Sequence, residues 1–399
     1  MSGRPPLLLI GAGGTGGHMF PAQALAEVML GRGWRVNLST DRRGARFTDN
    51  FPDAVRVRVV ETGTFHRGSW VERAMVPVWL ATGTARTILA MRRDPPRVVA
   101  GFGGYPAFPA LAAAGLTRTP AMIHEQNGVL GRVNRLFARR ADRLAVSVWP
   151  MELPAGTRSV HTGNPVRKTV RDAVAARYRP PDAGSGPVRL LVIGGSQGAS
   201  VLSSVVPTAL TQLPESERSR LQVAQQCRPE DVAATAAAYR KAGIVAEIAP
   251  FFPDVPERLA GAQLVISRAG ASSVAEIAAV GRPAILVPFA AAIRDEQTAN
   301  AKSLAVAGGA VVFREPDLNP EALATAIGDI IGAPERAEAM AEAARSAGRP
   351  DAAESLALVV EELAGTLRGP KAGDGPTSIP SGSAAVRDAE MSIATGRRP

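Results

Sequence analysis

The sequence has few cysteines, few histidines and no long apolar run. Among its 399 residues are one cysteine, Cys227, and four histidines. One cysteine excludes an intramolecular disulfide and a zinc site built from several thiolates. No stretch of about 20 uncharged apolar residues is present, so no segment is expected to span a bilayer. The apolar run at residues 7–10 is too short for a signal peptide. We therefore expect a soluble or peripheral protein of a reducing compartment.

Excess positive charge is confined to the first part of the chain. The net charge is +10, and residues 1–165 hold 21 arginines, no lysine and 10 acidic residues. Residues 166–399 hold 25 basic and 26 acidic residues, which nearly cancel. A basic first part indicates an anionic partner, such as nucleic acid, an anionic lipid surface or a phosphorylated substrate.

Strand-like and helix-like segments alternate, and the pattern restarts near residue 164. We expect strands at residues 6–10, 34–38, 98–101, 121–123, 144–146, 188–193, 264–266, 284–287 and 310–313. Such alternation is typical of parallel sheets. The sequence therefore predicts an α/β protein with two doubly wound domains, residues 1–163 and 164–367. The last helix, about 352–367, is a candidate to pack back on the first domain. Residues 368–399, rich in Gly, Pro, Ser and Ala, are expected to be a disordered tail.

Three glycine-containing turns connect a strand to a helix, at residues 11–17, 194–199 and 267–276. Glycines let backbone N–H groups approach an anion, which the following helix N-terminus also favours. The alternative is a tight turn without a ligand. The first turn also matches the dinucleotide pattern Gly-x-Gly-x-x-Gly, with Asp41 as a possible ribose carboxylate, so a nicotinamide-dependent oxidoreductase stays open.

Polar residues follow the predicted strands at their carboxyl ends, where doubly wound sheets bind ligands. His124, Glu125, Gln126 and Asn127 form one such cluster, and His18 lies at the exit of the first glycine turn. Neutral imidazoles at His18 or His124 could act as a general base. The sequence shows no metal-ligand spacing. If the glycine turns bind a diphosphate that leaves in the reaction, backbone N–H groups, helix N-termini and arginine would have to stabilise its negative charge.

The segment 69–93 combines two tryptophans and many aliphatic residues with four arginines. This composition suits a helix at a membrane interface, and the basic first part favours anionic lipid. An ordinary buried helix pair is the alternative. Nucleic acid fits less well, because the aromatic residues cluster with aliphatic ones.

Taken together and in order, these motifs resemble the MurG family of peptidoglycan N-acetylglucosaminyltransferases. The motifs are GGTGGHMFP at 13–21, GGY at 103–105, HEQN at 124–127, GNPVR at 163–167, GGSQGA at 194–199, SRAG at 267–270, EIA at 276–278, VPF at 287–289, and Gln297 with Asn300. The resemblance covers about residues 6–365. It implies the GT-B fold, in which two Rossmann-like domains face each other across a cleft.

The resemblance also implies a reaction. An inverting, metal-independent and cofactor-free hexosyltransferase would move GlcNAc from UDP-GlcNAc to the MurNAc 4-hydroxyl of lipid I, giving lipid II and UDP. It would serve peptidoglycan and cell-wall synthesis, and with it cell shape, cell division and the cell cycle. Its implied location is peripheral, on the cytoplasmic face of the bacterial inner membrane. Its implied partners are the two substrates, an anionic membrane surface and other cell-wall synthesis proteins, with no nucleic acid.

Residue roles follow from the matched motifs. The resemblance implies that His18 is the general base, with Glu125 as the rival, and that Tyr105 and Asn127 line the acceptor side. The first turn, with Thr15, Gly16 and Gly17, would face the diphosphates. On the donor side the resemblance implies Ser196, Ala271, Ser272, Ser273 and Val274 at diphosphate or ribose, Arg167 near the nucleotide, Glu276 at the ribose hydroxyls, Phe252 beside uracil and Gln297 at the GlcNAc hydroxyls.

Three other functions stay open at this point. A UDP-sugar epimerase or hydrolase of the same fold would need no lipid acceptor. A nicotinamide-dependent oxidoreductase would rest on the first glycine turn. A membrane-docking scaffold without catalysis would keep only nucleotide binding.

Overall fold

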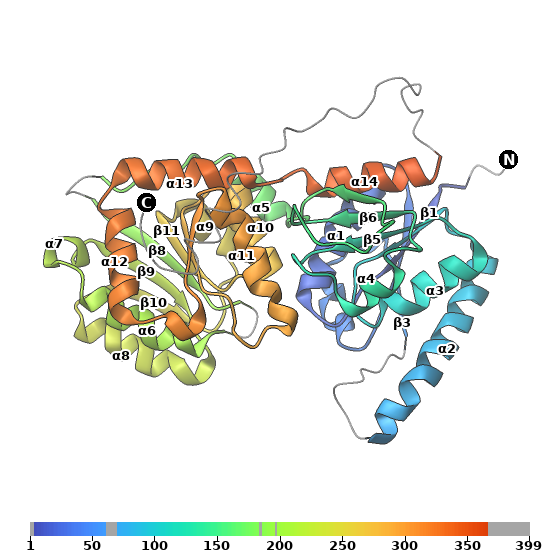
Figure 1. Cartoon of the computed structure of the whole chain (residues 1–399), viewed down its shortest axis with the longest axis horizontal. Helices are drawn as coiled ribbons and strands as arrows, with labels where there is room; N and C mark the ends of the chain where they lie inside the picture. The colour runs from blue at the N-terminus through green and yellow to red at the C-terminus, as the bar shows by residue number, and fades with distance from the viewer. Residues whose placement is uncertain (1–3, 61–69, 183–185, 196–197, 366–399) are drawn as a thin grey trace. The chain divides into compact units, whose positions relative to one another are not determined.

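The computed structural model describes residues 4–60, 70–182, 186–195 and 198–365. The chain forms two compact units, shown in Figure 1. Unit 1 combines residues 1–172 with 270–279 and 349–367, and unit 2 combines 173–269 with 280–348. The predicted tail at 368–399 lies outside the described residues.

Unit 1 is built on a seven-stranded sheet with the order β3-β2-β1-β4-β5-β6-β7. All its strand pairs are parallel. The strands are β1 Leu7–Gly11, β2 Arg35–Thr40, β3 Arg56–Val59, β4 Val98–Gly101, β5 Ala121–Glu125, β6 Arg143–Val146 and β7 Ser159–His161. Parallel strands need crossover connections, which here are mostly helices.

Helices cover both faces of this sheet. Leu8 and Ile10 of β1 pack in one core with α1 and α14, whereas Leu9 points into a second core with α3 and α4. Alternate strand residues face opposite sides, so buried strands carry apolar residues throughout. The helices of unit 1 are α1 Gly16–Gly31, α2 Trp70–Arg93, α3 Ala107–Thr117, α4 Arg132–Phe137, α5 Lys168–Ala173 and α14 Ala352–Leu363, with α10 Ala271–Val280 at its boundary.

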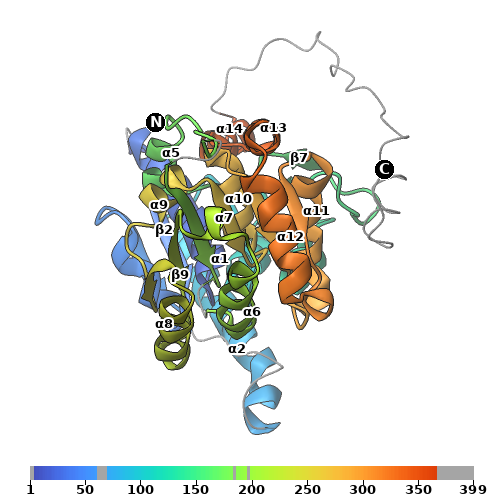
Figure 2. The ribbon, with the colours of Figure 1, turned by 90° about the vertical axis from the view of Figure 1, so that its left-hand side faces the viewer.

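Unit 2 repeats the design with six parallel strands in the order β10-β9-β8-β11-β12-β13. Its strands are β8 Val188–Ile193, β9 Leu221–Gln226, β10 Val245–Ala249, β11 Leu264–Ser267, β12 Ala284–Leu286 and β13 Ala310–Val312. Helices α6, α8 and α12 pack with β8 and β9 in one core, and Figure 2 shows α6 beside α8. The helices of unit 2 are α6 Ser200–Thr211, α7 Glu215–Arg218, α8 Val232–Lys241, α9 Val255–Gly261, α11 Glu296–Val306, α12 Pro320–Ile331 and α13 Pro334–Ala347.

Strand order reverses direction once in each unit. β1 pairs with both β2 and β4, and β8 pairs with both β9 and β11. In doubly wound sheets, ligands bind beyond the carboxyl ends of the strands at this reversal. The glycine-rich turns after β1, β8 and β11 leave the sheets there.

The prediction of two doubly wound parallel-sheet domains is confirmed. The last helix, α14, packs against α1, β4 and β5 within unit 1 and ends at Leu363. The sequence reading missed the edge strands β3, β7 and β10, and also β9. All four side chains of β3 are exposed, so burial left no apolar signal in its sequence.

Candidate functional site

The first glycine turn is held in shape by Asp41 from the end of β2. The Oδ1 atom of Asp41 accepts from Gly14 N at 3.2 Å and from Gly44 N at 2.8 Å. Its Oδ2 atom accepts from Arg43 Nε at 3.1 Å, and the residue is 3% exposed. Because this carboxylate already serves the protein's own backbone, it is not presented to a ribose. The structure thus removes the main support for a nicotinamide cofactor.

Another glycine-containing turn, which follows β4, packs directly on the first glycine turn at residues 11–17. Gly104 has a φ of +73°, and a Cβ atom there would lie 2.8 Å from the carbonyl oxygen of Gly13. Both the left-handed conformation and the close approach require glycine. The two turns are therefore a single packed structure at the sheet reversal of unit 1.

His18 lies in the first turn of α1, against both glycine turns. Its Nδ1 atom is 3.0 Å from the carbonyl oxygen of Gly13, which can only accept, so Nδ1 carries the proton. Its Nε2 atom lies beside Gly103 and keeps a lone pair. Burial is the main cause that lowers the pKa of His18. The imidazole is therefore neutral at neutral pH and able to accept a proton at Nε2.

The other predicted residues of this turn surround the start of α1. Thr15 is the N-cap residue, and its hydroxyl lies 3.4 Å from His18 Nδ1 without capping the helix. Gly16 and Gly17 follow in the first helical turn, which contains no acidic side chain. Free N–H groups at a helix start without acidic residues favour an anion.

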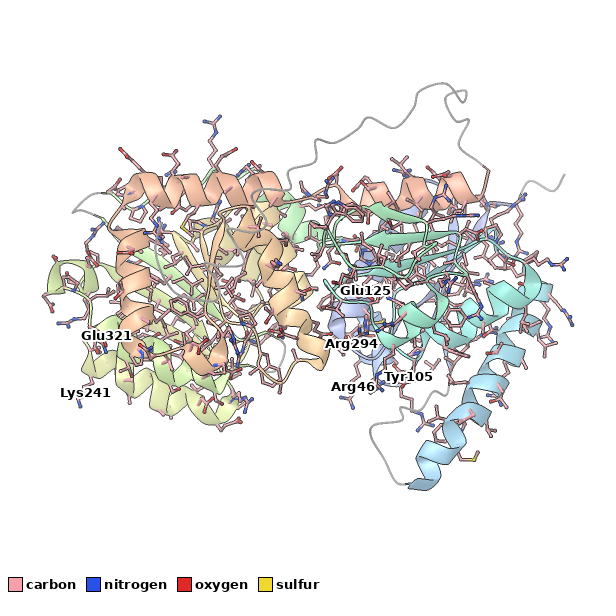
Figure 3. The ribbon with its side chains drawn as sticks, viewed as in Figure 1. Arg46, Tyr105, Glu125, Lys241, Arg294 and Glu321 are labelled. Atoms are coloured by element: carbon pink, nitrogen blue, oxygen red, sulfur yellow. The ribbon has the colours of Figure 1, made fainter. Side chains whose placement is uncertain are left out.

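Glu125, the rival for the role of base, is locked inside unit 1 (Figure 3). Its Oε1 atom accepts from Asn127 N at 3.1 Å, and its Oε2 atom accepts from Gly131 N at 2.8 Å and Asn134 Nδ2 at 2.9 Å. The side chain is 1% exposed, and burial raises its pKa. Glu125 thus fixes the loop after β5, which includes the predicted acceptor residue Asn127.

His124 is not available as a base, and that expectation is wrong. Its Nε2 atom is 3.1 Å from the carbonyl oxygen of Gly163 and so carries the proton. Its Nδ1 atom accepts from Gln126 Nε2 at 3.1 Å. With both nitrogens engaged and the ring fully buried, its pKa falls to about 4, chiefly through burial. His124 ties β5 to the segment that leaves unit 1.

Two predicted nucleotide residues contact each other. Arg167 donates from Nε to Glu276 Oε1 at 3.1 Å and from Nη2 to Oε2 at 3.2 Å. The guanidinium also lies 5.5 Å from the ring centroid of Phe20. Burial raises the pKa of Glu276, although Arg167 opposes this. The carboxylate of Glu276 is therefore engaged by Arg167 through both of its oxygens.

The third glycine turn leads from β11 into α10. Ala271, Ser272 and Ser273 are half-buried at the start of this helix, and Val274 is buried. The hydroxyl of Ser272 is buried without a hydrogen-bond partner in the described part of the chain. A buried hydroxyl without a partner at a helix start is suited to a polar ligand. Ser196, predicted in the second glycine turn, lies outside the described residues.

The remaining predicted donor residues differ in accessibility. Phe252 is 4% exposed, with the Arg258 guanidinium 4.2 Å above its ring, whereas the adjacent Phe251 is 72% exposed. Gln297, near the start of α11, is half-buried, and its Oε1 atom accepts from Phe289 N at 3.0 Å. Tyr105, after β4, is half-buried (Figure 3). The roles assigned to these residues stay predictions.

Several contributors escaped the sequence reading. Asn134 reaches from α4 to Glu125, and Arg268 pairs with Glu315 far along the chain. No sequence signal links such residues, because only the tertiary structure brings them together. In the described ranges, no group of three or more His, Cys, Asp or Glu side chains could hold a metal ion. Within those same residues, every helix is too short or too polar to cross a bilayer.

Comparison with known proteins gives consistent matches across both units. Residues 8–146 match the glycosyltransferase family 28 N-terminal domain, and residues 189–356 match the glycosyltransferase family 28 C-terminal domain. Relatives from Mesorhizobium japonicum and Methylobacterium nodulans are 46% and 48% identical, over 90% of this chain and 95% and 97% of theirs. Both carry the name UDP-N-acetylglucosamine–N-acetylmuramyl-(pentapeptide) pyrophosphoryl-undecaprenol N-acetylglucosamine transferase.

Solved structures agree with these matches. MurG of Acinetobacter baumannii superposes with a TM-score of 0.74 at 30% identity, over 90% of this chain and 99% of that one. The calicheamicin glycosyltransferase CalG4 superposes with a TM-score of 0.61 at 17% identity, over 92% of this chain and 100% of that one, which shows a shared fold. The architecture is that of the GT-B glycosyltransferases. The chain belongs to the MurG family of glycosyltransferases.

Proposed function

We propose that this protein transfers GlcNAc from UDP-GlcNAc to the MurNAc 4-hydroxyl of the undecaprenyl-diphosphate-linked acceptor, lipid I. The products are lipid II and UDP. The observation that carries the proposal is His18, a neutral imidazole held by Gly13 with its Nε2 lone pair beside the glycine turns of unit 1. Relatives that match along almost their whole length carry the name of this transferase.

His18 is the general base in this proposal. Its Nε2 atom takes the proton of the acceptor hydroxyl while that oxygen forms a bond to C1 of GlcNAc. The bond from C1 to the UDP oxygen breaks in the same displacement, and UDP leaves with the electron pair. The configuration at C1 is inverted. Because burial lowers the pKa of His18, the imidazole is neutral at neutral pH and can accept this proton.

Glu125 acts as a positioning residue and not as the base. Both of its oxygens already accept hydrogen bonds from the loop that includes Asn127 and Gly131, or from Asn134. A carboxylate that is engaged in this way would have to break these bonds to reach a substrate. Asn127 and Tyr105 are left to line the acceptor.

The donor binds through the glycine turns after β8 and β11. Ser196 and the 271–274 segment, where the Ser272 hydroxyl has no partner in the described chain, receive the diphosphate or the ribose. Arg167 lies near the nucleotide. Glu276 accepts hydrogen bonds from the ribose hydroxyls, which replace part of its hydrogen bonding with Arg167. Phe252 lies beside uracil, and Gln297 reads the GlcNAc hydroxyls. Helix N-termini, N–H groups and arginine stabilise the leaving diphosphate without a metal.

A hollow on the outside of unit 1 supports an anionic membrane surface as partner. It measures about 270 Å³ and lies between β3 and α2, lined in part by Arg58, Arg86 and Arg93. None of these guanidiniums forms an ion pair with a carboxylate of the described residues. Val59 and Leu89 in its lining are 51% and 52% exposed. Arginines without a carboxylate partner in the described residues, beside exposed apolar side chains, fit the headgroup region of an anionic bilayer.

The other face of α2 is an ordinary packing surface. This agrees with the alternative interpretation of the segment as part of a buried helix pair. Val76, Leu80 and Met91 are buried, and α2 packs along α3. We place the enzyme, accordingly, at the cytoplasmic face of the inner membrane, where other cell-wall synthesis proteins would be its neighbours. Through its product it would serve cell-wall growth, and with that cell shape, cell division and the cell cycle.

The first experiment is transfer of labelled GlcNAc from UDP-GlcNAc to a short-chain lipid I analogue in the presence of EDTA. We expect product with inverted configuration and one UDP released for each sugar transferred. Turnover of UDP-GlcNAc without an acceptor would favour an epimerase or hydrolase. Donor binding without transfer would favour the scaffold, and NAD(H) binding by calorimetry would revive the oxidoreductase.

The membrane contact is tested with vesicles. Vesicles that contain phosphatidylglycerol should bind the protein, and those of phosphatidylcholine alone should not. Replacing Arg58, Arg86 and Arg93 with Gln should weaken binding. The matched control replaces Arg118, Arg139 and Arg140, three exposed arginines of unit 1 outside the hollow. Equal loss in both triple variants would show that net charge alone governs binding and that the hollow has no special part.

A further inference from the structure

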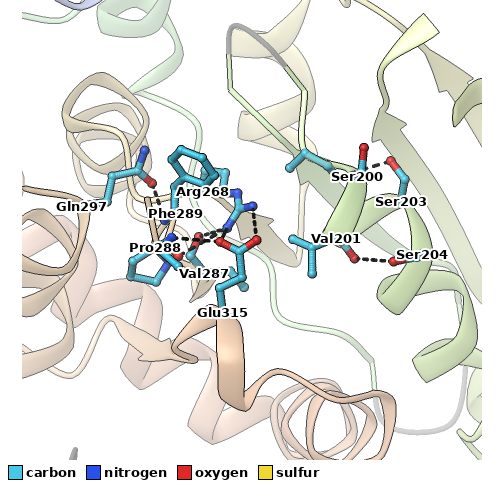
Figure 4. Close-up of polar contacts among 12 residues, drawn as sticks. Ser200, Val201, Ser203, Ser204, Arg268, Val287, Pro288, Phe289, Gln297 and Glu315 are labelled. Carbon is cyan, nitrogen blue, oxygen red and sulfur yellow. Dashed lines mark hydrogen bonds and ion pairs between the residues drawn. The ribbon is translucent and has the colours of Figure 1, made fainter. Parts of the chain in front are cut away.

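Two side chains of unit 2 hold a turn without regular secondary structure, residues 287–290, which follows β12 (Figure 4). Arg268 Nη1 donates to the carbonyl oxygens of Val287 at 3.2 Å and Pro288 at 3.3 Å. The Arg268 guanidinium also lies 5.2 Å from the ring centroid of Phe289. Glu315 Oε2 accepts from the backbone N of Ala290 at 2.9 Å. Each of the four consecutive residues of the 287–290 turn thus contacts one of these two side chains.

Arg268 and Glu315 also hold each other. Their contacts run from Nη1 to Oε2 and from Nη2 to Oε1, both at 3.0 Å. The Arg268 side chain is 8% exposed, so this bidentate pair is largely shielded from water. The hydrogen bond from Arg268 is the main cause that lowers the pKa of Glu315, which is therefore ionised at neutral pH. The backbone groups of a segment without regular secondary structure need hydrogen-bond partners other than a neighbouring strand. Here the charged side chains of Arg268 and Glu315 are such partners.

The 287–290 turn is joined to Gln297 at the start of α11. The N–H group of Phe289 donates to Gln297 Oε1 at 3.0 Å, which fixes the oxygen end of the side-chain amide. The Nε2 group of Gln297 makes no hydrogen bond within the described residues. It remains as a donor whose direction depends on where the turn places Phe289 N (Figure 4).

We infer that Arg268 and Glu315 are positioning residues for the donor sugar, and that they act through the 287–290 turn and Gln297. This inference rests on the proposed function, in which Gln297 reads the GlcNAc hydroxyls. Neither Arg268 nor Glu315 touches the sugar. The pair fixes the turn, the turn fixes the oxygen of the Gln297 amide, and the amide presents its N–H groups to a hydroxyl. The pair therefore serves the binding of UDP-GlcNAc, and the binding of UDP does not depend on it.

The test compares the affinities for UDP and UDP-GlcNAc in a small set of variants. Glu315→Gln keeps the shape of the side chain but loses one of the two carboxylate oxygens. Arg268→Lys keeps the charge but cannot reach both carbonyls and the carboxylate together. The matched control is Asp317→Asn in the same 3-10 helix, Glu315–Asp317, where the carboxylate pairs with the exposed Arg314. Calorimetry with each ligand and steady-state kinetics with the full chain are the measurements.

We expect Glu315→Gln and Arg268→Lys to weaken UDP-GlcNAc binding and raise its KM by about tenfold, the size of one lost hydrogen bond. Affinity for UDP should stay within about twofold of the native protein, which also shows that unit 2 is folded. In a Gln297→Ala background, Glu315→Gln should add less than about twofold, because both act on one contact. Asp317→Asn should match the native protein.

Three results would overturn the inference. The first is an equal loss of UDP and UDP-GlcNAc affinity in Glu315→Gln, which would mark a purely structural role. The second is a loss of UDP-GlcNAc affinity in the double variant that equals the product of the two single-variant losses, which would show that Glu315 and Gln297 act independently. The third is native behaviour of Glu315→Gln. Failure of the native protein to bind UDP-GlcNAc would instead refute the proposed function.

Discussion

His124 makes the stability of unit 1 depend on pH. The ring is fully buried, accepts at Nδ1 from Gln126 and donates at Nε2 to Gly163. Protonation would bury a cation and turn the Nδ1 acceptor into a second donor facing the Gln126 amide. Its pKa falls from 6.5 to about 4 on folding. Between these values the unfolded chain binds a proton that the folded chain does not.

The sign and the size of the effect follow from this. Because the folded pKa is lowered, the stability that His124 provides above pH 6.5 is lost as the pH falls toward 4. The shift corresponds to about 3 kcal/mol of unfolding free energy in total, at about 1.4 kcal/mol for each unit of pKa. About 2 kcal/mol of this is lost between pH 7 and pH 4.5.

Urea unfolding followed by tryptophan fluorescence measures this loss. All four tryptophans lie in residues 1–172, so the signal reports on unit 1. His124→Gln keeps a donor for Gly163 but cannot titrate. From pH 7 to pH 4.5, the native protein should lose about 2 kcal/mol more than this variant. Titration of His18, His161 and Glu125 affects both proteins alike and cancels. Parallel pH dependence of the two proteins would refute the reasoning.

Three further substitutions test the catalytic end of unit 1. His18→Gln should lower kcat by about 10²- to 10⁴-fold with little change in donor KM. In the native protein, kcat/KM should begin to fall only when the pH is below 6.5, because burial lowers the pKa of His18. Glu125→Gln should lower the unfolding free energy of unit 1 by about 2–4 kcal/mol, because the NH₂ group of the glutamine would face N–H donors. Unchanged stability, together with loss of the decrease in kcat/KM at acidic pH, would instead identify Glu125 as the base. Gly104→Ala should destabilise unit 1 by at least about 1 kcal/mol in urea unfolding. The control Gly115→Ala, on the exposed side of α3 with open space around it, should stabilise by about 0.5–1 kcal/mol, and equal effects of both would contradict the strain argument.

Much of the fold could be predicted because its signals are local. The central strands β1, β4, β8 and β11 are mostly buried and apolar, and β1, β8 and β11 lead into the three glycine-rich turns that the sequence predicts. Their positions were therefore predicted to within a residue or two. The edge strand β3 could not be found in this way. It reads Arg-Val-Arg-Val with every side chain exposed, and only its pairing with β2 makes it a strand.

The candidate site was less predictable, because residues of the same type have opposite surroundings. His18 lies in the first turn of α1 and His124 lies near the end of β5, yet the Nε2 lone pair of His18 is available whereas the Nδ1 lone pair of His124 accepts from Gln126. Phe251 and Phe252 are neighbours, yet one is exposed and the other is buried under Arg258. Sequence alone does not distinguish such pairs, because burial and hydrogen-bond partners come from distant segments.

The sequence by itself determined the two doubly wound units, the glycine turns at their sheet reversals and the family to which the chain belongs. These depend on apolar periodicity and on glycine, which act over a few neighbouring residues. Only the tertiary structure decided that Glu125 fixes a loop, that His18 engages Gly13 through Nδ1 and leaves Nε2 without a hydrogen bond to the described residues, and that Arg268 and Glu315 hold one turn. The last pair is 47 residues apart in sequence. Its partnership arises because parallel strands bring their carboxyl ends to one edge of the sheet.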